Sequence, residues 1–343
     1  MKKTAATLLL AMTMLGNAEA QSIQKYFGYF SGDSQGVTIS PPATALSEFQ
    51  SSSNLYSIGG WSGDESTAGR AASTQYILSQ LALAKAAHIH ATIPGNAFLF
   101  QLNSTTKCPI NDPGAAQSWN AIVQAMVSAG YIDVGSPDRS VVSAIYVVDE
   151  PNGPATQNGP NCLPDVSGAP NPALQNAVNA IRSNPSTAMI PLASVLNGSV
   201  GFANISQGMQ LFDWVGFDNY SDSESQWESQ LATLKSYAPT KKYILVPGAM
   251  SNNDGGICVG TQSPTPFIEE LQTDPQAVWL APFVWFSSGS CLGVRDNPSL
   301  NATYTSIGTS IKAQGCSSSM AARNFCKPQP IAQVVSILFS NNN

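Results

Sequence analysis

Short apolar runs of β-type residues alternate with longer segments of helical periodicity along most of this chain. The apolar runs predict eight strands, at 26–30, 55–60, 89–94, 144–148, 189–195, 214–218, 243–247 and 279–286. The helical spacing of apolar residues predicts eight helices, at 42–49, 73–87, 116–129, 172–183, 208–214, 223–238, 266–272 and 300–314. The pattern therefore repeats a strand–helix unit eight times.

Several of the predicted strands are apolar at consecutive positions, as expected for a parallel sheet that helices cover on one face. Eight alternating units in one chain favour a single (β/α)8 TIM barrel over an open, doubly wound sheet. No Gly-x-Gly-x-x-Gly follows the first strand, which argues further against a dinucleotide-binding fold. Because no Pro/Ser-rich linker divides the chain, we expect one barrel domain over residues 21–314.

Both ends of the sequence differ from the barrel pattern. Residues 1–20 combine a Lys-Lys start, a short apolar stretch and a small-residue end, which predicts a secretory signal peptide. The apolar stretch is too short to span a bilayer, so we expect an exported protein, extracellular or periplasmic, that is not embedded in a membrane. Residues 315–343 are predicted to form a short, disulfide-closed extension packed on the barrel.

The chain has six cysteines and no Cys-x-x-Cys spacing, so disulfides are the better interpretation in an exported protein. Fifteen connectivities are open for six cysteines. Pairing of neighbours needs the least chain crossing and is our hypothesis: Cys108 with Cys162, Cys258 with Cys291, and Cys316 with Cys326.

The charge balance and the histidines exclude several classes of function. A formal net charge of -6 with scattered basic residues argues against a nucleic-acid partner. The two histidines, His88 and His90, lie where the third strand begins, which is the wrong end of a barrel for catalysis. No Gly-x-Ser-x-Gly or His-x-x-x-His motif is present. We therefore expect no metal and no cofactor. We also expect a monomer.

Two adjacent carboxylates, Asp149 and Glu150, follow the fourth predicted strand. In a barrel this strand end faces the mouth in which such folds build their sites. Loss of hydration there would raise the pKa of a carboxyl group and let it serve as a proton donor. Asp, Glu, Pro and Gly also end strands with no other role, so a purely structural interpretation stays open.

The sequence Asp149-Glu150-Pro151 resembles the Asn-Glu-Pro that ends the fourth strand in many retaining barrel glycoside hydrolases. This resemblance implies that Glu150 is the acid/base and that Asp149 contacts the sugar. Those enzymes carry a nucleophilic Glu after the seventh strand, where this chain has only Leu-Val-Pro-Gly-Ala-Met, with Asp254 further on in a turn-like run. The adjacent pair is also similar to hexosaminidases in which the Asp orients the substrate's acetamido group. Alternatively, Asp218, after the sixth strand, is the second catalytic carboxylate, or the barrel only binds.

Other strand ends place polar and aromatic residues at the same mouth. Hydroxyl groups need directional hydrogen bonds, and the apolar faces of sugar rings lie against flat side chains. Trp285 also resembles the tryptophan after the eighth strand in many such glycosidases, whereas Trp214 and Trp279 are assigned to packing. The predicted substrate-binding residues are Asp33, Trp61, Asn96, Asn219, Tyr220 and Trp285.

The sequence thus favours a secreted glycoside hydrolase that acts on a polysaccharide or oligosaccharide. Its predicted catalytic residues are Glu150, Asp149 and Asp218. A non-catalytic carbohydrate-binding barrel is the first alternative, since no acid follows the seventh strand. A structural exported protein is the second.

Overall fold

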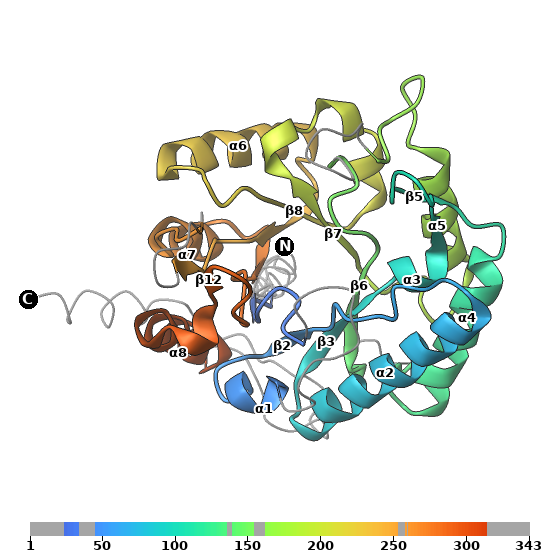
Figure 1. Ribbon diagram of the computed structural model, residues 1–343, viewed down its shortest axis with the longest axis horizontal. Helices are drawn as coiled ribbons and strands as arrows, with labels where there is room; N and C mark the ends of the chain where they lie inside the picture. Colours follow the sequence, from blue (N-terminus) through green and yellow to red (C-terminus); the bar gives the residue numbers. More distant parts are fainter. Residues whose placement is uncertain are drawn as a thin grey trace, which may run out of the picture.

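The computed structural model of the protein describes residues 24–33, 45–135, 139–153, 162–252, 258 and 260–313. Eight parallel strands form a nearly closed barrel with helices around it (Figure 1), which confirms the predicted (β/α)8 fold. The barrel strands are β1 (Tyr26–Phe27), β2 (Leu55–Ser57), β3 (His90–Pro94), β6 (Val142–Tyr146), β7 (Leu192–Asn197), β8 (Trp214–Asp218), β9 (Lys242–Leu245) and β11 (Ala277–Leu280). Each lies within or beside one of the eight predicted strands.

The strands are hydrogen-bonded in the order β1-β11-β9-β8-β7-β6-β3-β2. Between β1 and β2 the ring is joined by single hydrogen bonds, such as Asn54 N–H to Phe27 O at 3.1 Å. Gly28 permits this approach, because a Cβ at Gly28 would lie only 2.0 Å from the carbonyl oxygen of Leu55. The first and last parts of the barrel therefore meet without a regular ladder.

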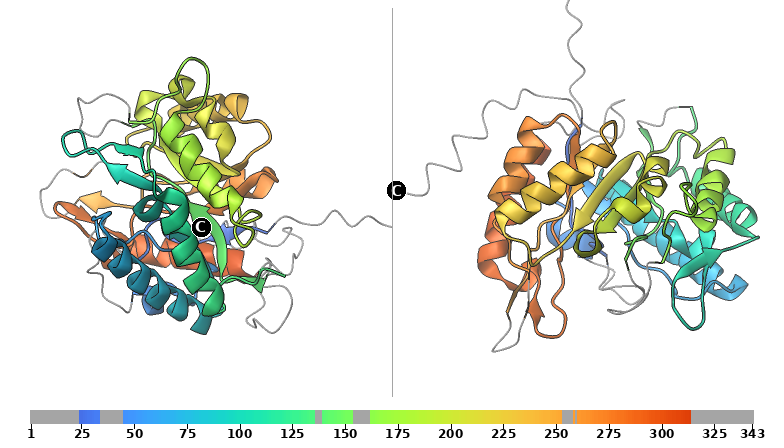
Figure 2. Two further views of the ribbon diagram at one scale, coloured as in Figure 1. Left: turned by 90° about the vertical axis from the view of Figure 1, so that its right-hand side faces the viewer. Right: turned by 90° about the horizontal axis from the view of Figure 1, so that it is seen from above.

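Helices cover the outside of the strand ring in all three views (Figures 1 and 2). They are α1 (Ala45–Phe49), α2 (Thr67–Ala86), α3 (Asn96–Leu99), α4 (Ala115–Ser128), α5 (Pro172–Ser183), α6 (Glu224–Tyr237), α7 (Thr265–Thr273) and α8 (Pro298–Ala313). The helix predicted at 208–214 is wrong: Gly208–Leu211 form a 3-10 turn, one of three such turns between β7 and β8. The sequence also does not predict two small antiparallel strand pairs, β4 (Phe100–Leu102) with β5 (Pro109–Asn111) and β10 (Ser251–Asn252) with β12 (Cys291–Leu292).

Two apolar cores hold the barrel together. The larger core lies between strands and helices, and includes Phe27, Trp119 and Phe267. The smaller core fills the inside of the barrel and includes Trp214 and Trp279, so the prediction that these two tryptophans serve packing is confirmed. A filled interior leaves the carboxyl ends of the strands as the place for polar side chains.

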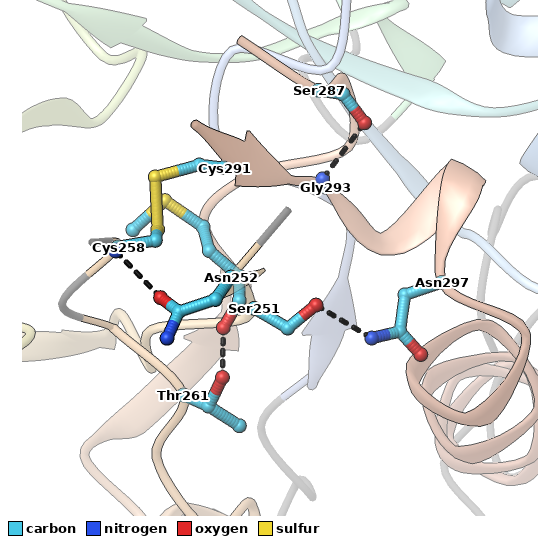
Figure 3. Close-up of a disulfide and its surroundings, with 9 residues drawn as sticks. Ser251, Asn252, Cys258, Thr261, Ser287, Cys291, Gly293 and Asn297 are labelled. Carbon is cyan, nitrogen blue, oxygen red and sulfur yellow. Dashed lines mark hydrogen bonds between the residues drawn. A yellow bond between two sulfur atoms is a disulfide. The ribbon is translucent and has the colours of Figure 1, made fainter. Parts of the chain in front are cut away.

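Two of the three predicted disulfides are confirmed, Cys108–Cys162 and Cys258–Cys291. The second joins β12 to the chain after β10, where Cys258 N–H donates to Asn252 Oδ1 at 2.5 Å (Figure 3). The predicted Cys316–Cys326 pair, the signal peptide at 1–20, the extension at 315–343 and Asp254 lie outside the described residues.

His90 lies at the start of β3, away from the mouth, as predicted. Burial lowers its pKa to about 4, and its Nδ1 lies 3.1 Å from the carbonyl oxygen of Ser140. A buried, neutral imidazole in this place supports packing. Among the described residues, none of the helices has the length and apolar character of a membrane span.

Candidate active site

The predicted pair Asp149 and Glu150 follows β6 by three and four residues, at the carboxyl end of the barrel. Glu150 N–H donates to Val195 O of β7 at 2.9 Å, which ties this turn to the neighbouring strand. Glu150 has a φ of 40°, an angle that residues other than Gly rarely adopt. Such a conformation costs about 1–3 kcal/mol and persists where surrounding contacts hold it.

Asn152 and Asn197 hold the turn in place. Asn152 is fully buried, and its Nδ2 donates to the carbonyl oxygens of Asn197 and Gly201 at 2.9 and 2.8 Å. Its Oδ1 accepts the Asn197 N–H at 2.8 Å. The side chain of Asn197, the last residue of β7, donates in turn to Glu150 Oε1 at 3.1 Å. The buried amide of Asn152 and the half-buried amide of Asn197 therefore orient the carboxyl group of Glu150.

Asp218 is the last residue of β8 and reaches the same place. Burial raises its pKa well above the usual range, and the charges of Glu150 and Asp149 raise it further. The hydroxyl of Tyr220, which donates to Asp218 Oδ2 at 2.7 Å, opposes this rise. Asp218 therefore keeps its proton to a higher pH than an exposed Asp does.

Asp149 is exposed, whereas Glu150 and Asp218 are half-buried. Loss of hydration raises its pKa to about 6, against the hydrogen bond from Tyr146, and the charge of Glu150 adds to the rise. Tyr146 Oη donates to Asp149 Oδ1 at 2.6 Å and accepts the N–H of Val195 at 3.1 Å. Asp149 thus belongs to the same electrostatic cluster.

Four aromatic rings connect the acids on the other side of the mouth. Phe30 contacts Tyr146 and Phe283, with ring centroids 5.4 and 6.1 Å away. Tyr220 stacks on Phe283 at 4.9 Å with an interplanar angle of 5°. Since Tyr146 binds an oxygen of Asp149 and Tyr220 binds one of Asp218, rings and carboxylates form a continuous set of contacts around the mouth.

Asp33, predicted to bind sugar, is instead fully buried and bound by protein. Its carboxylate accepts the N–H groups of Gly59 and Gly60 at 2.7 and 3.0 Å and the hydroxyl of Tyr76 at 2.8 Å. Burial raises its pKa in spite of these donors. The residue clamps the chain after β1 to the chain after β2.

The structure does not bring Trp61 and Trp285 to the mouth. Both are buried in the outer core, with 3% and 2% of their surface exposed. The indole of Trp285 donates to Glu48 Oε2 at 2.8 Å and packs against Tyr29 and Phe49. Neither tryptophan has a free face for a sugar ring.

Asn96 and Asn219 are half-buried at strand ends. The side chain of Asn219 donates to Asp222 Oδ1 at 2.8 Å and accepts from Ser221, so it is engaged within its own loop. Asn96, the first residue of α3, has no side-chain hydrogen bond among the described residues. Of the predicted binding residues, Tyr220 contacts the carboxylates directly.

Sequence reasoning missed Phe30, Tyr146, Phe283 and Asn197. Strand alternation would have indicated Phe283, because Trp279 and Ala281 point into the barrel and Phe283 is the next residue of that phase. The same alternation would have placed Trp285 inside the barrel, which is wrong because the regular strand ends at Leu280. Asn197 carried no distinctive signal, because its role depends on β7 and β6 being neighbours.

Within the described ranges, no group of three His, Cys, Asp or Glu side chains could hold a metal ion. Asp218, whose pKa is raised, lies close to Glu150 and Asp149, and such a group of neighbouring acids suits proton transfer.

No family model matches the chain, and no curated protein sequence matches it. Solved structures do match the fold. A β-galactosidase from Bacillus circulans sp. alkalophilus has a TM-score of 0.53 at 8% identity, over 86% of this chain and 57% of that one. An endo-β-1,4-mannanase double mutant from Cellulomonas fimi (TM-score 0.49, 14% identity, 82% and 70% covered) and a family 113 β-mannanase from Alicyclobacillus acidocaldarius (0.48, 12%, 85% and 99%) are also similar. The chain therefore shares its barrel fold with the β-galactosidase.

Proposed function

We propose that the protein is an exported glycoside hydrolase whose catalytic groups are the carboxyl pair Glu150 and Asp218. The observation that carries the proposal is the proximity of these two acids, which come from different strands, together with the raised pKa of Asp218. Hydrolysis of a glycosidic bond needs both a proton donor for the leaving oxygen and a carboxylate on the sugar side. Two neighbouring acids, one of which keeps its proton more readily than usual, offer both forms.

In this proposal the proton that Asp218 holds in the free protein passes to Glu150, which protonates the leaving oxygen as the glycosidic bond breaks and leaves Asp218 as a carboxylate. Asp218 acts on the anomeric carbon, either directly or by taking a proton from an attacking water. The elements of water are added across the bond in both cases. Asn197 positions Glu150 and Tyr220 positions Asp218. The half-buried rings of Tyr146, Phe283 and Tyr220 supply the apolar surface against which a sugar packs, and the buried ring of Phe30 supports two of them.

The test is a screen of purified protein on neutral and amino-containing polysaccharides, with reducing-sugar release as the readout. Glu150→Gln and Asp218→Asn should each lower turnover by at least about 100-fold, the scale of general acid–base catalysis. Glu269→Gln, at an exposed position on α7, is the matched control and should be unaffected. If Glu150→Gln and wild type cleave a responsive glycan equally, the assignment is wrong.

Aryl glycosides separate the two roles. A good leaving group needs no protonation, so Glu150→Gln should keep more activity on such substrates than on polysaccharides. Asp218→Asn should lose activity on both. The reverse result would exchange the two assignments.

Export is part of the proposal. Two disulfides among the described residues are typical of proteins that fold in an oxidising compartment. A carbohydrate-binding barrel without catalysis is the second candidate, since no carboxylate directly follows β9. Glycan binding by calorimetry without product after long incubation would favour it.

A further inference from the structure

The three acids of the mouth lack a cationic partner. No described Lys or Arg side chain forms an ion pair with Asp149, Glu150 or Asp218. The described arginines pair elsewhere: Arg70 with Asp112, Arg139 with Asp133, Arg182 with Asp213 and Arg295 with Asp296. The negative charge of this acidic cluster therefore has no cationic partner among the described side chains.

The protein also supplies few hydrogen-bond donors to these acids. Side chains provide a single neutral donor to each: Tyr146 to Asp149, Asn197 to Glu150 and Tyr220 to Asp218. A carboxylate can accept about four hydrogen bonds. Asp218 Oδ1 is buried and has no donor among the described residues. Buried acceptors without donors are rare in folded proteins unless a ligand, an ion or water completes them.

We propose that this mouth binds a glycan carrying free amino groups, with an ammonium group of the sugar between Asp149 and the Glu150–Asp218 pair. The inference deepens the proposed function and rests on it for the chemical step. An ammonium group brings a positive charge and three donors. Charge-assisted hydrogen bonds are about twice as strong as neutral ones. The rings of Tyr146 and Tyr220, each bonded to one of the acids, offer faces that attract a cation.

Two other classes of glycan fit less well. A uronate or sulfated sugar would place another negative charge beside carboxyl groups that have no cationic partner among the described residues. A neutral sugar supplies hydroxyl donors but leaves the charge of the mouth uncompensated. Only the amino sugar meets both needs of the site.

The test compares binding of monosaccharides, which cannot be hydrolysed. Glucosamine, galactosamine and mannosamine are titrated by calorimetry and saturation-transfer NMR against glucose, galactose and mannose and against their N-acetylated forms. We expect at least one amino sugar to bind about tenfold more tightly than its neutral and acetylated counterparts, a difference of about 1.4 kcal/mol. The preference should shrink in 0.5 M NaCl, because salt screens charge. Equal binding of the three forms, or no binding of any amino sugar, overturns the proposal.

Matched variants separate the mouth from the acidic surface as a whole. Asp149→Asn and Glu269→Gln each remove one formal negative charge, but Glu269 is exposed on α7. The first should weaken amino-sugar binding about tenfold, and the second should leave it unchanged. An equal loss in both variants would indicate non-specific attraction and contradict the proposal.

Hydrolysis assays then distinguish this inference from the proposed function. Oligomers of β-1,4-linked glucosamine, N-acetylglucosamine and glucose differ only at C2, so they form a matched set of substrates. Cleavage of neutral oligomers without an amino-sugar preference leaves the glycosidase proposal standing and removes this one. Preferential binding of amino sugars with no cleavage of any glycan would support this inference and contradict the proposed glycosidase function.

Discussion

Tyr146 donates its hydroxyl hydrogen to Asp149 Oδ1 at 2.6 Å, from the last residue of β6 to the turn that follows it. Loss of hydration raises the pKa of Asp149 to about 6, and the bond from Tyr146 is the largest influence that opposes this rise. The hydroxyl therefore helps to keep Asp149 ionised beside two other acids. It is a positioning group whose removal has an electrostatic signature.

We expect Tyr146→Phe to raise the pKa of Asp149 above 6, because the ionised carboxylate loses a donor. The measurement is an NMR titration of the Asp149 carboxyl carbon. Tyr76→Phe is the control, since it removes a hydroxyl bound to Asp33 and should not move the Asp149 midpoint. An unchanged or lower Asp149 midpoint in Tyr146→Phe would contradict the role given to this bond.

Asp149 should also make stability depend on pH. Its pKa is about 6 in the folded protein, against about 3.9 in an unfolded chain. Between these values the folded state binds the proton and the unfolded state does not, so the free energy of unfolding falls as pH rises from about 4 to 6. This contribution is fully present below pH 4 and is lost above pH 6.

Asp149→Asn removes this dependence. Relative to wild type, the variant should become more stable as pH rises from 4 to 6, and the difference should then stay constant. Urea unfolding at several pH values measures it. Asp133→Asn, at an exposed ion pair, is the control. A difference between variant and wild type that does not change with pH would show that Asp149 does not titrate in this window.

The sequence predicted the barrel because its signal is repeated and local. Each strand is a short apolar run with helical periodicity after it, and such units have one compact arrangement at this number. The helix predicted at 208–214 is wrong. The apolar residues between Gly208 and Asp213 have a spacing typical of a helix, whereas the chain forms short 3-10 turns between β7 and β8. Of the two small antiparallel pairs, β4 with β5 is a hairpin of very short strands, and β10 with β12 joins segments that α7 and β11 separate in the sequence, so neither has a strong local pattern.

The carboxylates could be predicted because strand ends in a barrel meet at one mouth. Asp149, Glu150 and Asp218 follow β6 or end β8, so the topology brings them together. The positions of the aromatic side chains were harder to predict, because a side chain at the end of a strand points inward or outward according to where the regular strand stops. Phe283 turns inward and Trp285 outward, although they are two residues apart.

The contrast between Phe283 and Trp285 gives a direct test of which ring meets the ligand. Phe283→Ala removes the ring that stacks on Tyr220, so it should weaken binding of a bound glycan about tenfold. Since Phe283 is half-buried, the free energy of unfolding should fall by roughly 2 kcal/mol, about half the loss for a fully buried Phe.

Trp285→Phe should lower stability without weakening glycan binding. It leaves Glu48 Oε2 without its donor and reduces packing against Tyr29, which lowers stability by roughly 2 kcal/mol. Glycan affinity should stay within about twofold of wild type, because Trp285 is buried away from the mouth. Calorimetric titration and urea unfolding measure the two effects. A larger loss of glycan affinity in Trp285→Phe than in Phe283→Ala would refute the assignment of Phe283 to the ligand and Trp285 to the core.

The two disulfides should differ in their effect on function more than on stability. Cys108–Cys162 closes 54 residues and Cys258–Cys291 closes 33. On a chain-entropy estimate each contributes about 4 kcal/mol. Cys162 N–H donates to Gly153 O at 3.0 Å, and Leu163 N–H donates to Pro151 O at 2.8 Å, so the first disulfide anchors the segment that carries Glu150. The second holds β12 against the chain after β10 and contacts none of the three acids.

Replacing Cys108 and Cys162 by Ala should therefore shift the Asp149 titration and lower glycan binding or turnover at a temperature where the variant is still folded. The matched pair of substitutions at Cys258 and Cys291 should lower the melting temperature by a similar amount and leave the Asp149 midpoint in place. Circular dichroism establishes the folded fraction before each assay. Equal functional losses in both variants, at equal folded fractions, would mean that the Cys108–Cys162 bond stabilises the barrel as a whole and does not specifically hold the acid pair.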